Sequence, residues 1–107
     1  MTSTKFAYIW QYVVDSHRRE FLDAYGAGGE WVKLFSRDPN YIETVLLRDA
    51  SDENRYITID YWTSRRARDA FQDKYKDEFL GLDKRCAEFT SKEEFLGDFD
   101  LVGSFDT

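Results

Sequence analysis

The chain has 107 residues, of which 42% are hydrophobic and 18% aromatic, and this composition excludes an intrinsically disordered protein. Its formal net charge of -6 argues against a nucleic-acid-binding protein, because such binding depends on cationic side chains that neutralise phosphates. The single cysteine, Cys86, excludes an intramolecular disulfide. The chain also contains only one histidine, so it has almost no ligands for a Cys/His metal site, and we expect no metal.

The length predicts a single domain over residues 1–107, with a structured core from about residue 6 to residue 99. No stretch approaches the ~18 consecutive apolar residues that cross a bilayer, so we expect no membrane segment. The N-terminal sequence MTSTKF lacks the basic start and apolar core of a secretory signal. Together these features predict a cytoplasmic protein.

The first predicted strand is Phe6–Val13, which is rich in aromatic and β-branched residues and contains no glycine or proline. One face of this strand carries Phe6, Tyr8, Trp10 and Tyr12, and the other carries Ala7, Ile9, Gln11 and Val13. Both faces are mostly apolar, which predicts that both are buried.

Two helical segments are predicted after this strand. Asp15 and Ser16 offer capping oxygens for the first of them. The glycine-rich stretch 26–29 ends it, because glycine tolerates the left-handed conformation common at helix ends. The second segment runs from Glu30 to Ser36 and closes before Pro39.

The second and third predicted strands are Tyr41–Arg48 and Arg55–Trp62, joined by a polar turn over 49–54 that suits an antiparallel hairpin. Ser64 then caps a helix with an apolar stripe. The stripe consists of Ala67, Ala70, Phe71, Tyr75 and Phe79. We expect Gly81 to interrupt this helix, with a further helical segment beyond it.

The end of the chain contains the last predicted strand, 94–99. Ser91 and Glu94 also fit a helix-capping box, but a strand completes the pattern of the preceding elements. The tail, 100–107, is expected to be loosely held.

This order of elements, β-α-β-β-α-β, predicts an α+β ferredoxin-like fold, with a four-stranded antiparallel sheet and helices on one face. Helices on one side bury only one face of a sheet, yet the first strand is apolar on both. We therefore expect a homodimer in which two sheets pack through their open faces. The alternative is that the tail and the loops cover the open face.

The segment around Trp62 resembles a known family. Trp62, Thr63 and Ser64, followed by a helix with Ala67, Ala70 and Phe71, are similar to the strand–W-x-S–helix signature of antibiotic biosynthesis monooxygenase-like proteins. The sequences LGDF (96–99) and AYGAGGEWVKLF (24–35) also fit this family. The resemblance implies a dimeric α/β barrel that oxidises electron-rich aromatic compounds with molecular oxygen and no cofactor.

The same resemblance speaks against the haem-degrading branch of the family. That branch has an asparagine on the first strand, and a tryptophan and a histidine on the second long helix. This chain has Trp10 near the first of these places, and Phe71 and Gly81 at the other two. Haem degradation is therefore not expected.

Two residues are candidates for a catalytic base. His17 is one because histidine is the side chain type whose unperturbed pKa lies near neutrality, although it also fits an exposed position at a helix start. Asp60 interrupts an apolar strand, and burying its carboxylate requires a partner, for which Arg48 and Arg55 are available. Asp60 is then either a base with a raised pKa in a cleft or a structural group at the dimer interface.

Five aromatic residues are candidates to line a pocket for a planar aromatic ligand, or else to belong to the core. They are Trp10, Tyr12, Tyr25, Trp31 and Trp62. The sequence further predicts a solvated face at Arg65, Arg66 and Arg68, in preference to an anion site. Cys86 is predicted to be a buried structural thiol.

The favoured function is therefore a cofactor-independent monooxygenase acting on a small phenolic or quinol-like compound. The alternative is a non-catalytic dimer that binds an apolar small ligand or serves a stress-related role.

Overall fold

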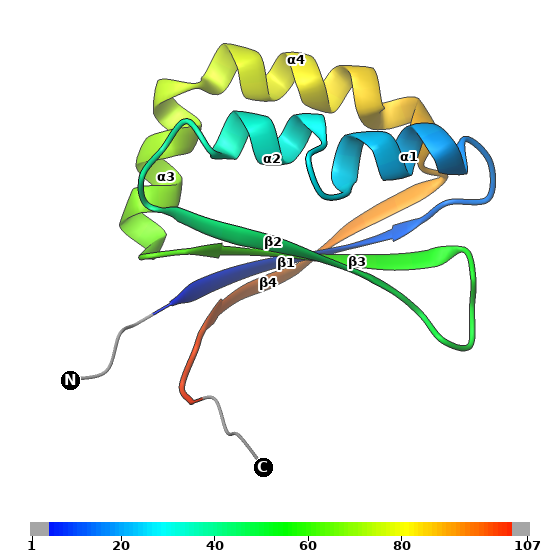
Figure 1. Cartoon of the computed structure of the whole chain (residues 1–107), viewed down its shortest axis with the longest axis horizontal. Helices are drawn as coiled ribbons and strands as arrows, with labels where there is room; N and C mark the ends of the chain where they lie inside the picture. Colours follow the sequence, from blue (N-terminus) through cyan, green and yellow to red (C-terminus); the bar gives the residue numbers. More distant parts are fainter. Residues whose placement is uncertain (1–4, 104–107) are drawn as a thin grey trace.

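Alternating side chains along four strands build a sheet with one face under the helices and one face open (Figure 1). The computed structural model describes residues 5–103. Its elements are β1 (Phe6–Val13), α1 (Arg18–Tyr25), α2 (Glu30–Phe35), β2 (Tyr41–Arg48), β3 (Arg55–Trp62), α3 (Arg65–Lys74), α4 (Lys76–Cys86), the 3-10 turn η1 (Ala87–Phe89) and β4 (Lys92–Asp100). The sheet order is β2-β3-β1-β4 and all pairings are antiparallel, which confirms the predicted ferredoxin-like fold.

Strand β3 shows most clearly how the two faces differ. Its even-numbered residues, Tyr56, Thr58, Asp60 and Trp62, are buried beneath the helices, whereas the odd-numbered residues from Arg55 to Tyr61 are only half-buried. Tyr12 pairs with Tyr56 and Ile9 pairs with Ile59, so β1 continues both faces. The register of the sheet therefore decides which side chains meet the helices.

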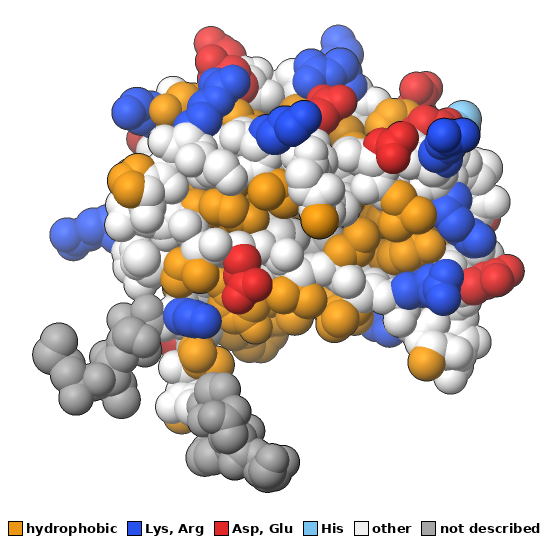
Figure 2. Space-filling view, in the orientation of Figure 1, with side chains coloured by type: hydrophobic (Ala, Val, Ile, Leu, Met, Phe, Trp, Pro, Cys, Tyr) orange, Lys and Arg blue, Asp and Glu red, His pale blue; other side chains and the backbone are white. Residues whose placement is uncertain are grey.

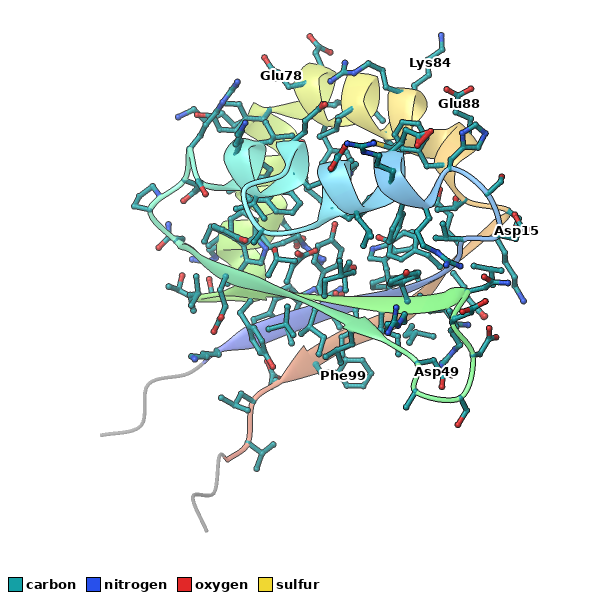
Figure 3. All side chains as sticks on the ribbon, turned by 45° about the vertical axis from the view of Figure 1, so that its right-hand side comes forward. Asp15, Asp49, Glu78, Lys84, Glu88 and Phe99 are labelled. Atoms are coloured by element: carbon teal, nitrogen blue, oxygen red, sulfur yellow. The ribbon has the colours of Figure 1, made fainter. Side chains whose placement is uncertain are left out.

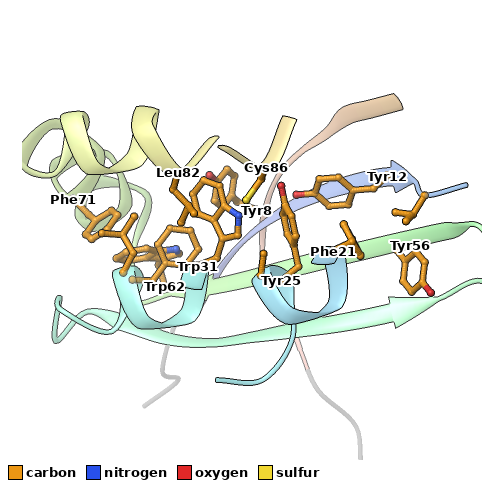
Figure 4. Packing of buried hydrophobic residues seen from close by; sticks show 14 of the residues in the cluster. Tyr8, Tyr12, Phe21, Tyr25, Trp31, Tyr56, Trp62, Phe71, Leu82 and Cys86 are labelled. Atoms are coloured by element: carbon orange, nitrogen blue, oxygen red, sulfur yellow. The ribbon is translucent and has the colours of Figure 1, made fainter. Parts of the chain in front are cut away.

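The core between sheet and helices consists largely of aromatic rings (Figure 4). Trp62 is fully enclosed and lies 5.1–5.7 Å, centroid to centroid, from the rings of Phe35, Tyr41 and Phe71. Edge-on and tilted contacts of this kind contribute about 0.5–1.5 kcal/mol each beyond the area that they bury. Trp62 and the rings around it thus form a structural cluster at one end of the core.

Helix α1 begins differently from the prediction. Its N-cap is His17, in a left-handed conformation with φ of 57°, and no side chain caps the helix. The expected caps, Asp15 and Ser16, precede that position. The first turn of α1 therefore leaves its backbone N–H groups without a capping side chain.

The glycine-rich stretch 26–29 joins α1 to α2, and the left-handed conformation predicted for it occurs at Gly28, with φ of 72°, and not at the helix cap. Gly26 has an extended conformation and not the left-handed one expected of a helix cap. At Gly29 an added Cβ would lie 2.5 Å from the carbonyl oxygen of Ala24. Glycine is required there because the two helices approach closely.

The second long helical region divides at Tyr75 and not at Gly81. Tyr75 lies outside the helical conformation, with φ of -110° and ψ of 31°, and its ring packs 4.9 Å from that of Phe71. Gly81 lies inside α4, where an added Cβ would meet only the Arg85 side chain at 3.8 Å, and a glycine is tolerated there at a cost of about 1 kcal/mol. Upstream, the predicted cap is confirmed, since the Ser64 hydroxyl accepts a hydrogen bond from the Ala67 N–H at 3.1 Å.

The last strand is confirmed and is longer than predicted. It begins at Lys92. The preceding residue, Ser91, donates a hydrogen bond from its backbone N–H to the Val13 carbonyl and therefore caps no helix. A bulge interrupts its pairing with β1 after Ile9. Of the tail predicted to be loosely held, Asp100 belongs to β4 and residues 104–107 lie outside the described residues.

The outer surfaces of the two layers differ in character. Charged side chains gather over the helices, and hydrophobic ones gather at the level of the sheet (Figure 2). Phe99 projects from the side of the sheet away from the helices (Figure 3), and it is half exposed, as is Leu47. No helix within residues 5–103 is long and apolar enough to cross a membrane.

We expect Phe71→Ala to lower the free energy of unfolding by about 3–5 kcal/mol, because it leaves a cavity among fully enclosed rings. Urea denaturation measures this change. The matched control is Leu80→Ala on α4, where the side chain is 52% exposed and the expected loss is below about 1 kcal/mol. Equal losses for the two variants would contradict the packing described above.

Candidate functional site

A cavity of about 220 Å³ lies between the helix-covered face of the sheet and the helices. Aromatic rings form most of its wall: Tyr8, Trp10, Tyr12, Tyr25, Trp31, Phe35 and Phe79. Its polar lining consists of Thr44, Thr58, Asp60, Asp83 and Glu93. All four strands and three of the helices contribute, so the fold as a whole holds the site in place. An apolar cavity with a few polar groups is typical of a small-molecule site.

Asp60 is the most unusual group in this wall. Its side chain is 5% exposed, and it accepts a hydrogen bond from the Thr44 hydroxyl at 2.6 Å. Burial raises the pKa of Asp60 to about 7, and the opposing effects of Thr44 and of the more distant Arg68 do not cancel it. The carboxyl can therefore gain and lose a proton near neutral pH.

A short hydrogen-bonded chain links this carboxyl to a half-buried tyrosine. The Tyr41 hydroxyl lies 2.6 Å from the Thr44 hydroxyl oxygen, which in turn lies 2.6 Å from Asp60. Because the Thr44 proton is donated to Asp60, Tyr41 donates to Thr44 when the carboxyl is ionised. The arrangement connects a buried acid to the rim of the protein through two hydroxyl groups.

The tyrosine hydroxyls of the cavity remain protonated at neutral pH. Burial is the largest cause that raises the pKa of Tyr8, of Tyr12 and of Tyr25 above the usual value. Tyr8 also accepts a hydrogen bond from the Gln72 amide at 3.1 Å, and Tyr12 accepts one from Thr58. These side chains can orient a ligand, whereas Asp60 is the group that can take up a proton.

Arg68 differs from the solvated position predicted for it. Its guanidinium is buried against the Tyr8 ring, 4.5 Å from the centroid, and forms ion pairs with Asp98 at 3.1 Å and Asp69 at 2.8 Å. Arg65 and Arg66, one turn earlier, are exposed as expected. Arg68 is buried because it lies on the inner face of α3, where an aromatic ring and a strand carboxylate meet it.

The arginines predicted to pair with Asp60 do not do so. Arg55 lies on the open face and contacts Gln11 at 2.9 Å and Asp49 at 3.2 Å. Arg48 is exposed and stands opposite Tyr56 in the register, whereas Thr44 stands opposite Asp60. Of the structural alternative, the hydrogen bond is present, but it comes from Thr44 of the same chain, and Asp60 lies on the helix-covered face and not on the open face.

The structure brings together four of the five predicted aromatic residues, namely Trp10, Tyr12, Tyr25 and Trp31. Trp62 is enclosed in the core outside the cavity. His17 is also outside it, because it precedes α1 as an exposed N-cap with its Nδ1 3.1 Å from Glu20.

Sequence reasoning missed several lining residues. Tyr8 belongs to the same alternating row as Trp10 and Tyr12, and that pattern could have identified it. Thr44, Asp83 and Glu93 carried no such signal, because their place in the wall depends on long-range pairing. Among residues 5–103 there is no group of three or more His, Cys, Asp or Glu side chains that could hold a metal ion.

A comparison of the sequence with protein-family models finds no match, and neither does a comparison with curated proteins. Solved structures do resemble the chain. A variant of SnoaB, a cofactor-independent oxygenase from Streptomyces nogalater, gives a TM-score of 0.80 at 20% identity, covering 96% of this chain and 98% of that one. A candidate antibiotic biosynthesis monooxygenase from Nitrosomonas europaea gives a TM-score of 0.71 at 13% identity, covering 95% of this chain and 93% of that one.

A third solved structure, a dimeric ferredoxin-like protein from an uncultured marine organism, gives a TM-score of 0.72 at 19% identity, covering 97% of this chain and 93% of that one. At these identities the likeness concerns the fold. The predicted resemblance to antibiotic biosynthesis monooxygenase-like proteins is confirmed at that level.

We expect the burial of Asp60 to make stability depend on pH. Its raised pKa means that the folded chain keeps a proton that the unfolded chain releases between pH 3.8 and about 7. The free energy of unfolding therefore falls as pH rises through this range, by up to about 1.4 kcal/mol per unit. Urea titrations at several pH values measure this slope.

The control for this slope is Asp60→Asn, which keeps an acceptor for Thr44 but cannot ionise. We expect its stability to fall less than that of the unmodified chain as pH rises toward about 7. A second control, Asp77→Asn on the exposed side of α4, should leave the slope unchanged. A slope that survives in Asp60→Asn would show that other groups cause it.

Proposed function

We propose that this chain is a cofactor-independent monooxygenase that oxidises a small phenolic or quinol-like compound in the aromatic cavity. The observation that carries the proposal is a single carboxyl, Asp60, buried in an aromatic wall with a pKa of about 7. The likeness of the fold to SnoaB, described as a cofactor-independent oxygenase, supports it.

In this proposal the aromatic walls bind the ring of the substrate. A planar ring packs favourably against Trp10 and Trp31 by stacking or edge-on contact. A volume of about 220 Å³ suits one small ring system and leaves little room for water. Low water content strengthens each polar contact that the substrate hydroxyl makes in the cavity.

Asp60 is the proposed general base. Its ionised form accepts the proton of the substrate hydroxyl, which leaves a phenolate that donates electrons to oxygen far more readily. The hydroxyls of Thr44 and Tyr41 then offer a route by which the proton leaves the cavity.

The substrate itself supplies the electrons in this scheme. Oxidation of a phenol to a quinone by one molecule of oxygen places one oxygen atom in the product and releases the other as water. Both hydrogen atoms of that water come from the substrate, one from the hydroxyl and one from the ring carbon that is oxygenated. No external reductant is needed for the balance.

We also propose a homodimer in which two sheets pack through their open faces. Ile59 lies at the centre of that face, paired with Ile9 on one side and Val45 on the other. Leu47 and Phe99 extend the apolar surface and are half exposed. The neighbour from the marine organism, described as dimeric, supports this assembly. A second copy would remove from water an apolar surface that the helices leave uncovered.

We expect oxygen uptake with a panel of phenols and hydroquinones, and a loss of about 10²–10⁴-fold in Asp60→Asn, because the general base is gone. The value of kcat/KM should rise with pH to about 7 and then level off, since only ionised Asp60 accepts a proton. An oxygen electrode measures both effects.

The matched control for this experiment is His17→Ala, which should keep full activity because His17 lies outside the cavity. Tight binding of these compounds without any oxygen uptake would favour the alternative of a non-catalytic binding protein. Full activity in Asp60→Asn would remove the proposed base.

We expect Ile59→Lys to convert the dimer into monomers, because it places two charges at the centre of an apolar interface, at a cost of several kcal/mol. Sedimentation velocity gives the mass of the species in solution. Leu80→Lys, at an exposed position of α4, is the control and should leave the mass unchanged. A monomeric unmodified chain at high concentration would contradict the proposed assembly.

A further inference from the structure

The rings around the cavity form a continuous series. The Trp10 ring stacks near Tyr12, Tyr12 lies 5.0 Å from Tyr25, and Tyr25 lies 5.9 Å from Trp31. Phe79 closes the series 5.1 Å from Trp31. The faces of such rings carry negative electrostatic potential, so several of them around one space attract a cation.

The charged groups of the wall also favour a cation. Within residues 5–103, the lining contains three carboxyl groups, those of Asp60, Asp83 and Glu93, and no Lys, Arg or His. None of the three forms a salt bridge with a described residue. The nearby cation, Arg68, is already matched by Asp98 and Asp69.

Two of these carboxyl groups belong to exposed residues of the lining, which form the mouth of the cavity, and the third is buried in the wall. Asp83 comes from α4 and Glu93 from β4, and both are exposed to solvent. Although Glu93 as a whole is exposed, partial burial of its carboxyl group and then the Asp83 carboxylate raise its pKa, so the two groups repel each other. Asp60 is buried, and Thr44 bonds only one of its two oxygens, which leaves the other free toward the cavity.

We infer that the cavity binds an organic cation, a small phenolic ring that carries an ammonium group. The rings and the unpaired carboxyl groups favour positive charge, and the ammonium would lie between Asp83 and Glu93 at the mouth. The inference rests on the proposed function in one respect, since it takes the phenol end to be the one that meets Asp60. The preference for a cation is a property of binding and does not require oxidation.

Three phenols that differ only at one end test this inference: tyramine, para-ethylphenol and para-hydroxyphenylpropionate. They carry a positive, a neutral and a negative group on the same ring. We expect tyramine to bind at least about tenfold more tightly than para-ethylphenol, and the anion to bind weakest. Titration calorimetry without oxygen measures binding alone, so an inactive enzyme would not obscure the result.

The double variant Asp83→Asn, Glu93→Gln should reduce the preference for tyramine to about twofold or less while leaving para-ethylphenol unaffected. Its thermal stability should not fall, because it removes a repulsion between like charges. Glu78→Gln, on the outer side of α4 in Figure 3, removes one charge that does not line the cavity and should keep the preference. Equal affinities for the three phenols, or a preference that survives in the double variant, would overturn the inference.

Discussion

The loss of water around one carboxyl is the constraint on which the site depends. Asp60 stands in a row of aromatic residues, where an ionised group gains little from solvent and has one hydroxyl as its hydrogen-bond donor. The cost of ionisation appears as a pKa near neutrality. A better-solvated carboxylate would stay ionised at every physiological pH and would be a much weaker base. The aromatic enclosure therefore shapes the cavity and also sets the pKa of its buried carboxyl.

The enclosure itself follows from the fold. Helices cover only one face of the sheet, and their inner surfaces supply rings that complete the rows presented by β1 and β3. Arg68 holds one end of this layer by stacking on Tyr8 while Asp98 on β4 binds its guanidinium. A buried ion pair of this kind fixes the position of α3 against the strand edge. The cavity remains open because large rings line it without filling it.

The fold could be predicted from the sequence because its signals are local. Each signal depends only on residues close to it in the sequence. They are the alternation in Phe6–Val13 and in Arg55–Trp62, the polar hairpin turn and the Ser64 cap. The site was harder to predict. Four lining aromatics were foreseen, but the side on which Asp60 lies and the partner that it contacts depend on the register with β2.

Errors arose where residue type was taken as a guide to environment. His17 was chosen because it is a histidine, but it lies at the surface, and Arg68 was expected at the surface because it is charged, but it is buried. The break at Tyr75 was missed because Gly81, a weak helix former, drew the prediction, whereas the backbone leaves the helical conformation at Tyr75.

The alternation of β3 has an evolutionary consequence. Its even-numbered residues belong to the core and the cavity wall, and its odd-numbered ones belong to the uncovered surface. A point substitution at an even-numbered position can alter the cavity wall without changing the uncovered surface, and one at an odd-numbered position can do the reverse. Insertion of a single residue would exchange the two roles at once. The cavity wall and the uncovered surface can thus change separately along this strand during evolution, while changes in its length are disfavoured.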